Sequence, residues 1–147
     1  MPLVMKWVGH IEEGIIDDRL VSYTDFLASF SAMLGYELKE TEGEDSYDGF
    51  SLFSTKYAKP YVRDHVIHQG MSGLLSFRKC DWKLINGSGK GFCDEYGYVF
   101  ENVNEKYQLF NMKDDIQEIR DVCKDYPELV KVIKEELDTL VKQGFSR

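Results

Sequence analysis

The sequence is poor in the residues that build disulfide scaffolds and metal centres. It contains three cysteines and three histidines among 147 residues. An odd number of cysteines leaves at least one thiol unpaired, and Cys80, Cys93 and Cys123 show no C-x-x-C spacing. The histidines are not spaced to complete a cluster with these cysteines. We therefore expect no disulfide framework and no metal ligands in this chain.

Long apolar runs and an excess of positive charge are also missing. No run approaches the ~18 apolar residues of a membrane-spanning helix. Residues 1–8 are interrupted by Lys6 and lack a small-residue cleavage site, so they do not predict a signal peptide, and localisation stays open. The formal net charge is −8. Because nucleic acids and anionic membranes are bound through basic surfaces, the sequence argues against both as partners.

The first part of the sequence predicts a strand, a helix and a long connection. Residues 3–8 form a short apolar run typical of a buried strand. Ser22 is of a type that caps helix N-termini. Asp25 follows three residues later, where its carboxylate can accept the backbone N–H of the capping residue. Apolar residues then recur at helical spacing as far as Gly35, a natural stop. Residues 36–60 are acidic and show no sustained period, which predicts a surface connection and a domain boundary.

The remainder predicts an antiparallel sheet followed by a long helix. Strand-like runs at 62–68, 74–78, 82–85, 98–100 and 107–111 are too closely spaced for parallel crossovers. A helix begins at Pro127 and ends at Gly144. Its predicted apolar stripe consists of Leu129, Ile133, Leu137, Leu140 and Val141. The predicted fold class is α+β, a small antiparallel sheet covered by a long C-terminal helix and preceded by a strand–helix piece.

Several of these segments contain short motifs that follow one another along the chain. Residues 66–70 and 75–78 lead into Asp-Trp-Lys-Leu-Ile and a Gly/Ser-rich turn at 81–89. Residues 108–115 read Gln-Leu-Phe-Asn-Met-Lys-Asp-Asp and are followed by Glu118. With the strand at 2–9 and the acidic Gly-Glu-Asp-Ser at 43–46, this series resembles the C-terminal portion of sulfatases of the arylsulfatase type, in the alkaline phosphatase superfamily. Cys80 stands where that family usually has Gly.

The resemblance implies a division of the chain and a role for it. Residues 1–35 would be the terminal strand and helix of the larger α/β catalytic domain, residues 36–60 an acidic connecting loop, and residues 61–147 the C-terminal subdomain. The function implied is that of a C-terminal fragment of a sulfuric ester hydrolase. Such a part would be structural and would shape the site for a sulfated carbohydrate or aryl sulfate. If the parent sulfatase is secreted, its location would be periplasmic or extracellular.

The residues of sulfate hydrolysis are not found in the sequence. The family's nucleophile is a formylglycine made from Cys in a Cys-x-Pro/Ala-x-Arg motif, and none of the three cysteines is followed by that pattern. The calcium ligands of the family would likewise belong to an upstream part. We therefore expect no catalytic residue and no cofactor in this chain, and no sulfatase activity from it alone.

Two residues are candidates to face substrate in an intact enzyme. His68 ends a strand beside a glycine turn, where it could hydrogen-bond a sugar hydroxyl or a sulfate oxygen. Lys83 could supply a positive charge for an anionic substrate. The alternative interpretations are a strand-end histidine bonded to backbone and an outward-facing strand lysine. Arg78 is expected to pair with a carboxylate and Trp82 to belong to the core.

Two further classes of function remain open. The chain could be a free-standing, non-catalytic acidic α+β interaction module. It could also be an enzyme of unrelated chemistry that uses His65, His68 and Asp64, although strand alternation puts the two histidines on opposite faces. An unpaired N-terminal strand or helix predicts self-association, because exposed apolar edges invite pairing with another chain.

Overall fold

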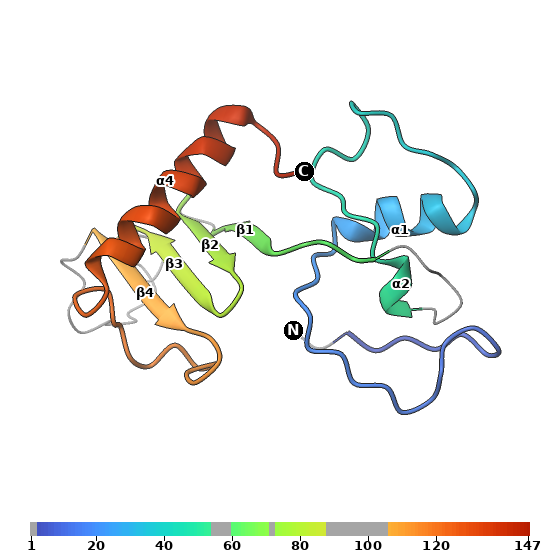
Figure 1. Cartoon of the computed structure of the whole chain (residues 1–147), viewed down its shortest axis with the longest axis horizontal. Helices are drawn as coiled ribbons and strands as arrows, with labels where there is room; N and C mark the ends of the chain where they lie inside the picture. Colours follow the sequence, from blue (N-terminus) through green and yellow to red (C-terminus); the bar gives the residue numbers. More distant parts are fainter. Residues whose placement is uncertain (1–2, 54–59, 71–72, 88–105) are drawn as a thin grey trace. The chain divides into compact units, whose positions relative to one another are not determined.

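The chain folds into two compact units. A computed structural model describes residues 3–53, 60–70, 73–87 and 106–147 (Figure 1). The first unit consists of Met1–Arg63 together with Phe145–Arg147, and the second of Asp64–Gly144. The chain therefore crosses between the units twice, at residues 63–64 and 144–145. The predicted division at residues 35 and 60 stays a prediction.

The helix predicted in the first unit is confirmed. It is α1, Asp25–Met33, and Asp25 Oδ2 accepts the Ser22 N–H at 3.0 Å, which is the bond expected of the residue that answers the cap. Ser22 itself is not the cap: that position is Thr24, whose side chain makes no capping bond. The helix stops at Gly35, which adopts a φ of +73° and donates its N–H to the Ala32 carbonyl at 3.1 Å. A left-handed residue at this place ends a helix, and glycine adopts it without strain.

Two features of the first unit differ from the prediction. Residues 3–8 form no strand, and Val4 and Val8 are largely exposed. A strand needs a neighbouring strand to bond its backbone, and the described part of this unit offers none. The predicted connection, in contrast, includes the short helix α2, Phe50–Phe53. It also includes the buried Ser46, whose Oγ accepts the Ala28 N–H at 2.8 Å.

The last two residues of the chain bond to this acidic segment. The Ser146 N–H donates to Asp45 Oδ1 at 2.8 Å, and its carbonyl accepts the Tyr47 hydroxyl. The Arg147 N–H donates to the Glu44 carbonyl at 3.1 Å. These hydrogen bonds join positions about a hundred residues apart and fasten the acidic segment to the C-terminus.

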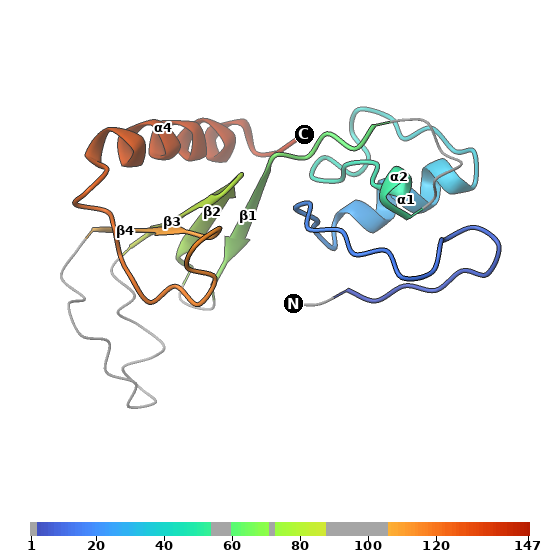
Figure 2. The same ribbon diagram turned by 60° about the horizontal axis from the view of Figure 1, so that its bottom comes forward.

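The second unit is the predicted antiparallel sheet with a helix on one face (Figure 2). The strands run in sequence order and are β1 (His65–Gln69), β2 (Leu75–Lys79), β3 (Trp82–Asn86) and β4 (Tyr107–Asn111). The helix is α4, Pro127–Gln143. The fold class predicted from the sequence is confirmed, while the strand predicted at 98–100 lies outside the described residues.

The core of the second unit lies between the sheet and α4. Phe77, Leu84 and Leu109 pair across three strands and are completely buried. The helix contributes three buried residues and two half-buried ones to this layer: Val130, Ile133, Leu137, Leu129 and Leu140. Burying a Leu or Phe side chain stabilises a fold by about 1.5–3 kcal/mol before entropy is subtracted. Val141, which the stripe included, is exposed in the last turn, and Val130 is buried instead.

The outer edge of β4 is covered by the segment that follows it. The Leu109 N–H donates to Asp121 Oδ1 at 3.0 Å, and its carbonyl accepts the Val122 N–H at 2.9 Å. Unpaired strand edges are a template for unwanted pairing with other chains. The bonds to residues 121–122 satisfy the backbone at the centre of this edge.

Candidate functional site

His68 and Lys83, the predicted substrate-facing residues, lie on the same face of the sheet. On β2, Ser76 and Arg78 flank the core residue Phe77 and therefore project to the side opposite α4. His68 pairs with Ser76, and Lys83 pairs with Arg78. Directly paired residues share a face, so the four side chains belong to one surface, which we call the outer face.

His68 and Lys83 share the outer face but do not contact each other directly. His68 lies on β1 and Lys83 on β3, with β2 between them and an offset of two residues along the strands. In ideal strand geometry this places their Cα atoms roughly 12 Å apart. His68 is exposed and Lys83 is half-buried. A ligand larger than a single ion is needed to contact both.

Lys83 is held by a carboxylate. Its Nζ lies 2.7 and 2.8 Å from the two carboxylate oxygens of Glu118, which comes from the connection between β4 and α4. Both side chains are half-buried, 22% and 28% exposed. Lys83 is thus a strand lysine on the outer face whose charge already has an anionic partner.

The backbone of Glu118 adopts an unusual conformation to make this ion pair. Its φ is +58°, in the left-handed region that residues other than glycine seldom occupy. The surrounding turn is fixed by Asp115, whose carboxylate accepts the N–H groups of Ile119 at 3.0 Å and Arg120 at 2.8 Å. The bonds from Arg120 and Ile119 hold the pKa of Asp115 below its usual value.

Arg78 differs from its predicted role. Its Nε donates weakly to the Cys80 carbonyl at 3.4 Å. In the described part of the chain, no carboxylate pairs with its guanidinium. The sequence predicted such a pair, and across the strands the residue opposite Arg78 is another cation, Lys83.

His65 and His68 occupy opposite faces of β1, as strand alternation predicts. His65 lies on the α4 side, where its Nδ1 is 2.7 Å from Asp64 Oδ1 and its ring packs 5.6 Å from that of Phe77. Burial alone would raise the pKa of Asp64. The hydrogen bond to His65 and the nearby Lys79 charge outweigh burial, so the pKa of Asp64 lies below its usual value. A site that combines His65, His68 and Asp64 is therefore not supported.

The first unit contains a buried ion pair that the sequence did not reveal. Asp25 and Arg63 are 38 positions apart, and their side chains are 1% and 2% exposed. Arg63 contacts the Asp25 carboxylate through Nε at 2.8 Å and Nη2 at 2.6 Å. The Arg63 guanidinium also lies 4.4 Å from the centre of the Tyr47 ring, a cation–π distance.

Further donors complete the environment of the Asp25 carboxylate. The Tyr61 hydroxyl donates to its Oδ2 at 2.7 Å, and the Tyr47 N–H donates to its Oδ1 at 2.9 Å. Burial and the bond to Asp25 raise the pKa of Tyr61 far above its usual value. A fully bonded carboxylate of this kind organises a fold and has no capacity left for substrate.

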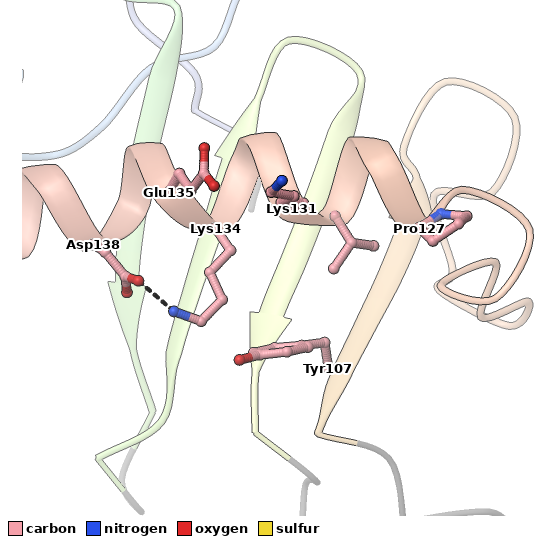
Figure 3. Close-up of a pocket in the computed structure, with 7 residues that line it drawn as sticks. Tyr107, Pro127, Lys131, Lys134, Glu135 and Asp138 are labelled. Atoms are coloured by element: carbon pink, nitrogen blue, oxygen red, sulfur yellow. Dashed lines mark hydrogen bonds and ion pairs between the residues drawn. The ribbon is translucent and has the colours of Figure 1, made fainter.

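A shallow groove of about 330 Å³ lies between α4 and the edge strand β4 (Figure 3). Its lining combines Tyr107 with apolar and charged residues of the helix, among them the ion pair of Lys134 with Asp138. The bond to Asp138 raises the pKa of Lys134. The groove lies on the helix side of the sheet, so neither His68 nor Lys83 lines it.

The described residues contain neither a cluster suited to a metal ion nor a helix suited to a membrane. No group of three or more His, Cys, Asp or Glu side chains is placed to hold a metal ion. Among the helices described, none combines the length and the apolar character needed to cross a membrane.

The fold and the comparisons with known proteins agree. The second unit has the α+β fold of sulfatase C-terminal domains, and the predicted resemblance to the C-terminal portion of sulfatases is confirmed. The N-acetylgalactosamine-6-O-sulfatase of Bacteroides thetaiotaomicron is 28% identical over 142 residues, which are 95% of this chain and 27% of that protein. No family model matches the chain.

Solved structures give the same result. One, from work on the metabolism of multiple glycosaminoglycans by Bacteroides thetaiotaomicron, is 28% identical with a TM-score of 0.64, and the match covers 79% of this chain and 24% of that one. A second, solved in complex with its substrate D-glucosamine-2-N,6-O-disulfate, shares the fold at 17% identity and a TM-score of 0.54, covering 81% and 23%. The chain thus spans about a quarter of the length of its relatives.

Proposed function

We propose that this chain forms the C-terminal, substrate-shaping part of a sulfatase that acts on a sulfated carbohydrate. The observation that carries the proposal is the alignment of 95% of the chain with an N-acetylgalactosamine-6-O-sulfatase at 28% identity. The shared fold at a TM-score of 0.64 supports it. The location that follows for a secreted parent enzyme is the periplasm or the exterior of the cell.

In this proposal the chemistry comes from outside these residues. The formylglycine nucleophile and the calcium ion would belong to an upstream catalytic part, because no cysteine of this chain lies in the required motif. Without that nucleophile and that metal, the covalent step and the polarisation of the sulfate that they would supply are missing. The chain alone would bind and orient substrate without hydrolysing it.

The test is an assay of the 147-residue chain with a chromogenic aryl sulfate and calcium, with metal content measured on the same sample. We expect no turnover and no stoichiometric metal. Turnover that survives repurification would overturn the proposal, because it would require an active site among residues assigned here to structure.

Within this function, His68 is proposed to contact the substrate from the outer face, whereas Lys83, the other candidate on that face, is proposed to stay bonded to Glu118. His68 is the more accessible of the two, while Lys83 is engaged by Glu118. NMR titration of the chain with N-acetylgalactosamine 6-sulfate should shift the His68 ring signals. Unchanged His68 signals at a saturating concentration of this sugar would remove His68 from the site.

A non-catalytic interaction module is the second candidate, and the exposed apolar residues of the first unit favour it. Val4, Val8 and Ile16 are 91%, 80% and 88% exposed. Apolar groups exposed to this degree favour association. Light scattering over a concentration series should show a dimer or larger species that Val4→Asp and Val8→Asp weaken. A strict monomer at high concentration would count against self-association.

A further inference from the structure

We infer that Arg78, rather than Lys83, is the cation with which the outer face recognises a sulfate group. The inference rests on the proposed function and deepens it by naming a residue that determines specificity. It is carried by three observations on the second unit: the register of β2 and β3, the ion pair of Lys83, and the contacts of Arg78.

The register places two positive charges directly opposite each other. Arg78 on β2 pairs with Lys83 on β3. Like charges at such a position destabilise a sheet unless an anion lies close to them. Glu118 supplies one negative charge, so the three side chains together keep a net charge of +1.

The geometry shows which of the two cations Glu118 neutralises. Both of its oxygens lie within 2.8 Å of Lys83 Nζ. The Glu118 backbone is held at a φ of +58° in a turn that Asp115 fixes, so the carboxylate is pre-positioned. A sulfate that bound Lys83 would have to displace this half-buried carboxylate, which would then lose its partner.

Arg78 carries the charge that remains. Its contact with the Cys80 carbonyl, at 3.4 Å, is long and offers no negative charge. Arg78 is half-buried, and an arginine can bury its aliphatic part while its charged end stays accessible. A guanidinium presents parallel N–H donors that match two oxygens of a sulfate, as they match those of a phosphate or carboxylate.

The neighbours of Arg78 suit a sugar that carries the sulfate. Ser76 lies two residues earlier on β2 and on the same face, roughly 7 Å away by strand geometry. His68 is directly opposite Ser76 on β1. A hydroxyl and an imidazole beside a guanidinium are suitable partners for sugar hydroxyls next to a sulfate ester. The ligand class is therefore a sulfated monosaccharide or the sulfated end of a glycan.

The experiment compares the binding of N-acetylgalactosamine 6-sulfate and of the same sugar without sulfate to the full chain, by NMR titration at low salt. We expect Arg78→Gln to weaken binding of the sulfated sugar about 10- to 100-fold, the worth of a charge-assisted contact. Arg78→Lys keeps the positive charge but loses the paired N–H donors of the guanidinium, so it should weaken binding less. The matched control replaces the whole ion pair, as Lys83→Gln with Glu118→Gln, because this leaves the net charge unchanged and should change affinity less than about threefold.

The outcomes separate this inference from the proposed function. Wild-type affinity in Arg78→Gln, or an equal loss in the ion-pair replacement, would overturn the role of Arg78 without bearing on the aryl sulfate assay. Equal affinity for the two sugars would also overturn it. No binding by the wild-type chain would overturn both this inference and the substrate-orienting role in the proposed function. The dispersion of the amide NMR signals shows whether each variant is folded. If Arg78→Gln unfolds, the affinity of Arg78→Lys for the sulfated sugar tests the role of Arg78 instead.

Discussion

The buried carboxylate of Asp25 offers a quantitative test of how the first unit is stabilised. It is 1% exposed and accepts hydrogen bonds from Arg63, Tyr61 and two backbone N–H groups. Asp25→Ala would leave the Arg63 guanidinium buried without its counter-charge. Removing one partner of a buried ion pair costs about 3–5 kcal/mol, which is a large part of the 5–15 kcal/mol that stabilises a typical domain. We therefore expect the first unit to unfold at much lower denaturant concentration.

The measurement is urea unfolding followed by the fluorescence of Trp7, which belongs to the first unit, in a Trp82→Phe background. The matched control is Asp17→Asn, because the Asp17–Arg19 pair is at the surface and should contribute less than about 1 kcal/mol. A loss below about 1 kcal/mol for Asp25→Ala would refute the reasoning. It would mean that the guanidinium finds water or another partner when the carboxylate is removed.

Three further predictions concern the core, a turn and the C-terminus. Leu137→Ala should destabilise the second unit by about 2–5 kcal/mol in urea unfolding followed by Trp82, because the side chain is completely buried. The pKa of Asp115 is lower in the folded protein than in the unfolded chain, so the ionised carboxylate stabilises the fold at neutral pH. This stabilisation is lost as the pH falls through the pKa of the folded protein. Asp115→Asn should therefore make the free energy of unfolding less dependent on pH in the acid range. Deleting residues 145–147 should speed amide hydrogen exchange in residues 43–47, since three hydrogen bonds to that segment disappear.

The second unit could be predicted from the sequence because its signals are local. Short runs separated by tight turns require antiparallel pairing, and α4 carries Pro127 at its first turn and Gly144 after its last. The apolar stripe identified which side of the helix is buried. Its error at Val141 arose because periodicity gives the direction of a side chain but not where along the helix the packing ends.

The first unit was harder to predict because its organising contacts are distant in sequence. Arg63 lies in the strand-like run at 62–68, where nothing marks a charged side chain as a core residue, and its partner is 38 positions earlier. Asp25 was recognised only as the residue that answers a helix cap, and of that role it keeps the bond from the Ser22 N–H. The strand predicted at residues 3–8 shows the same limit, since an apolar run becomes a strand only where another strand can bond its backbone.

The outer face shows why residue type alone does not identify a binding residue. Strand alternation is enough to put His68, Arg78 and Lys83 on one face, and all three can bind a sulfated sugar. What distinguishes them is a carboxylate from a different element. Glu118 engages Lys83 at both oxygens, and it can do so because a turn holds it in a conformation that sequence patterns do not predict. The lysine that resembled a substrate contact is therefore bound within the protein, and the arginine expected to be structural carries the positive charge that we propose for sulfate recognition.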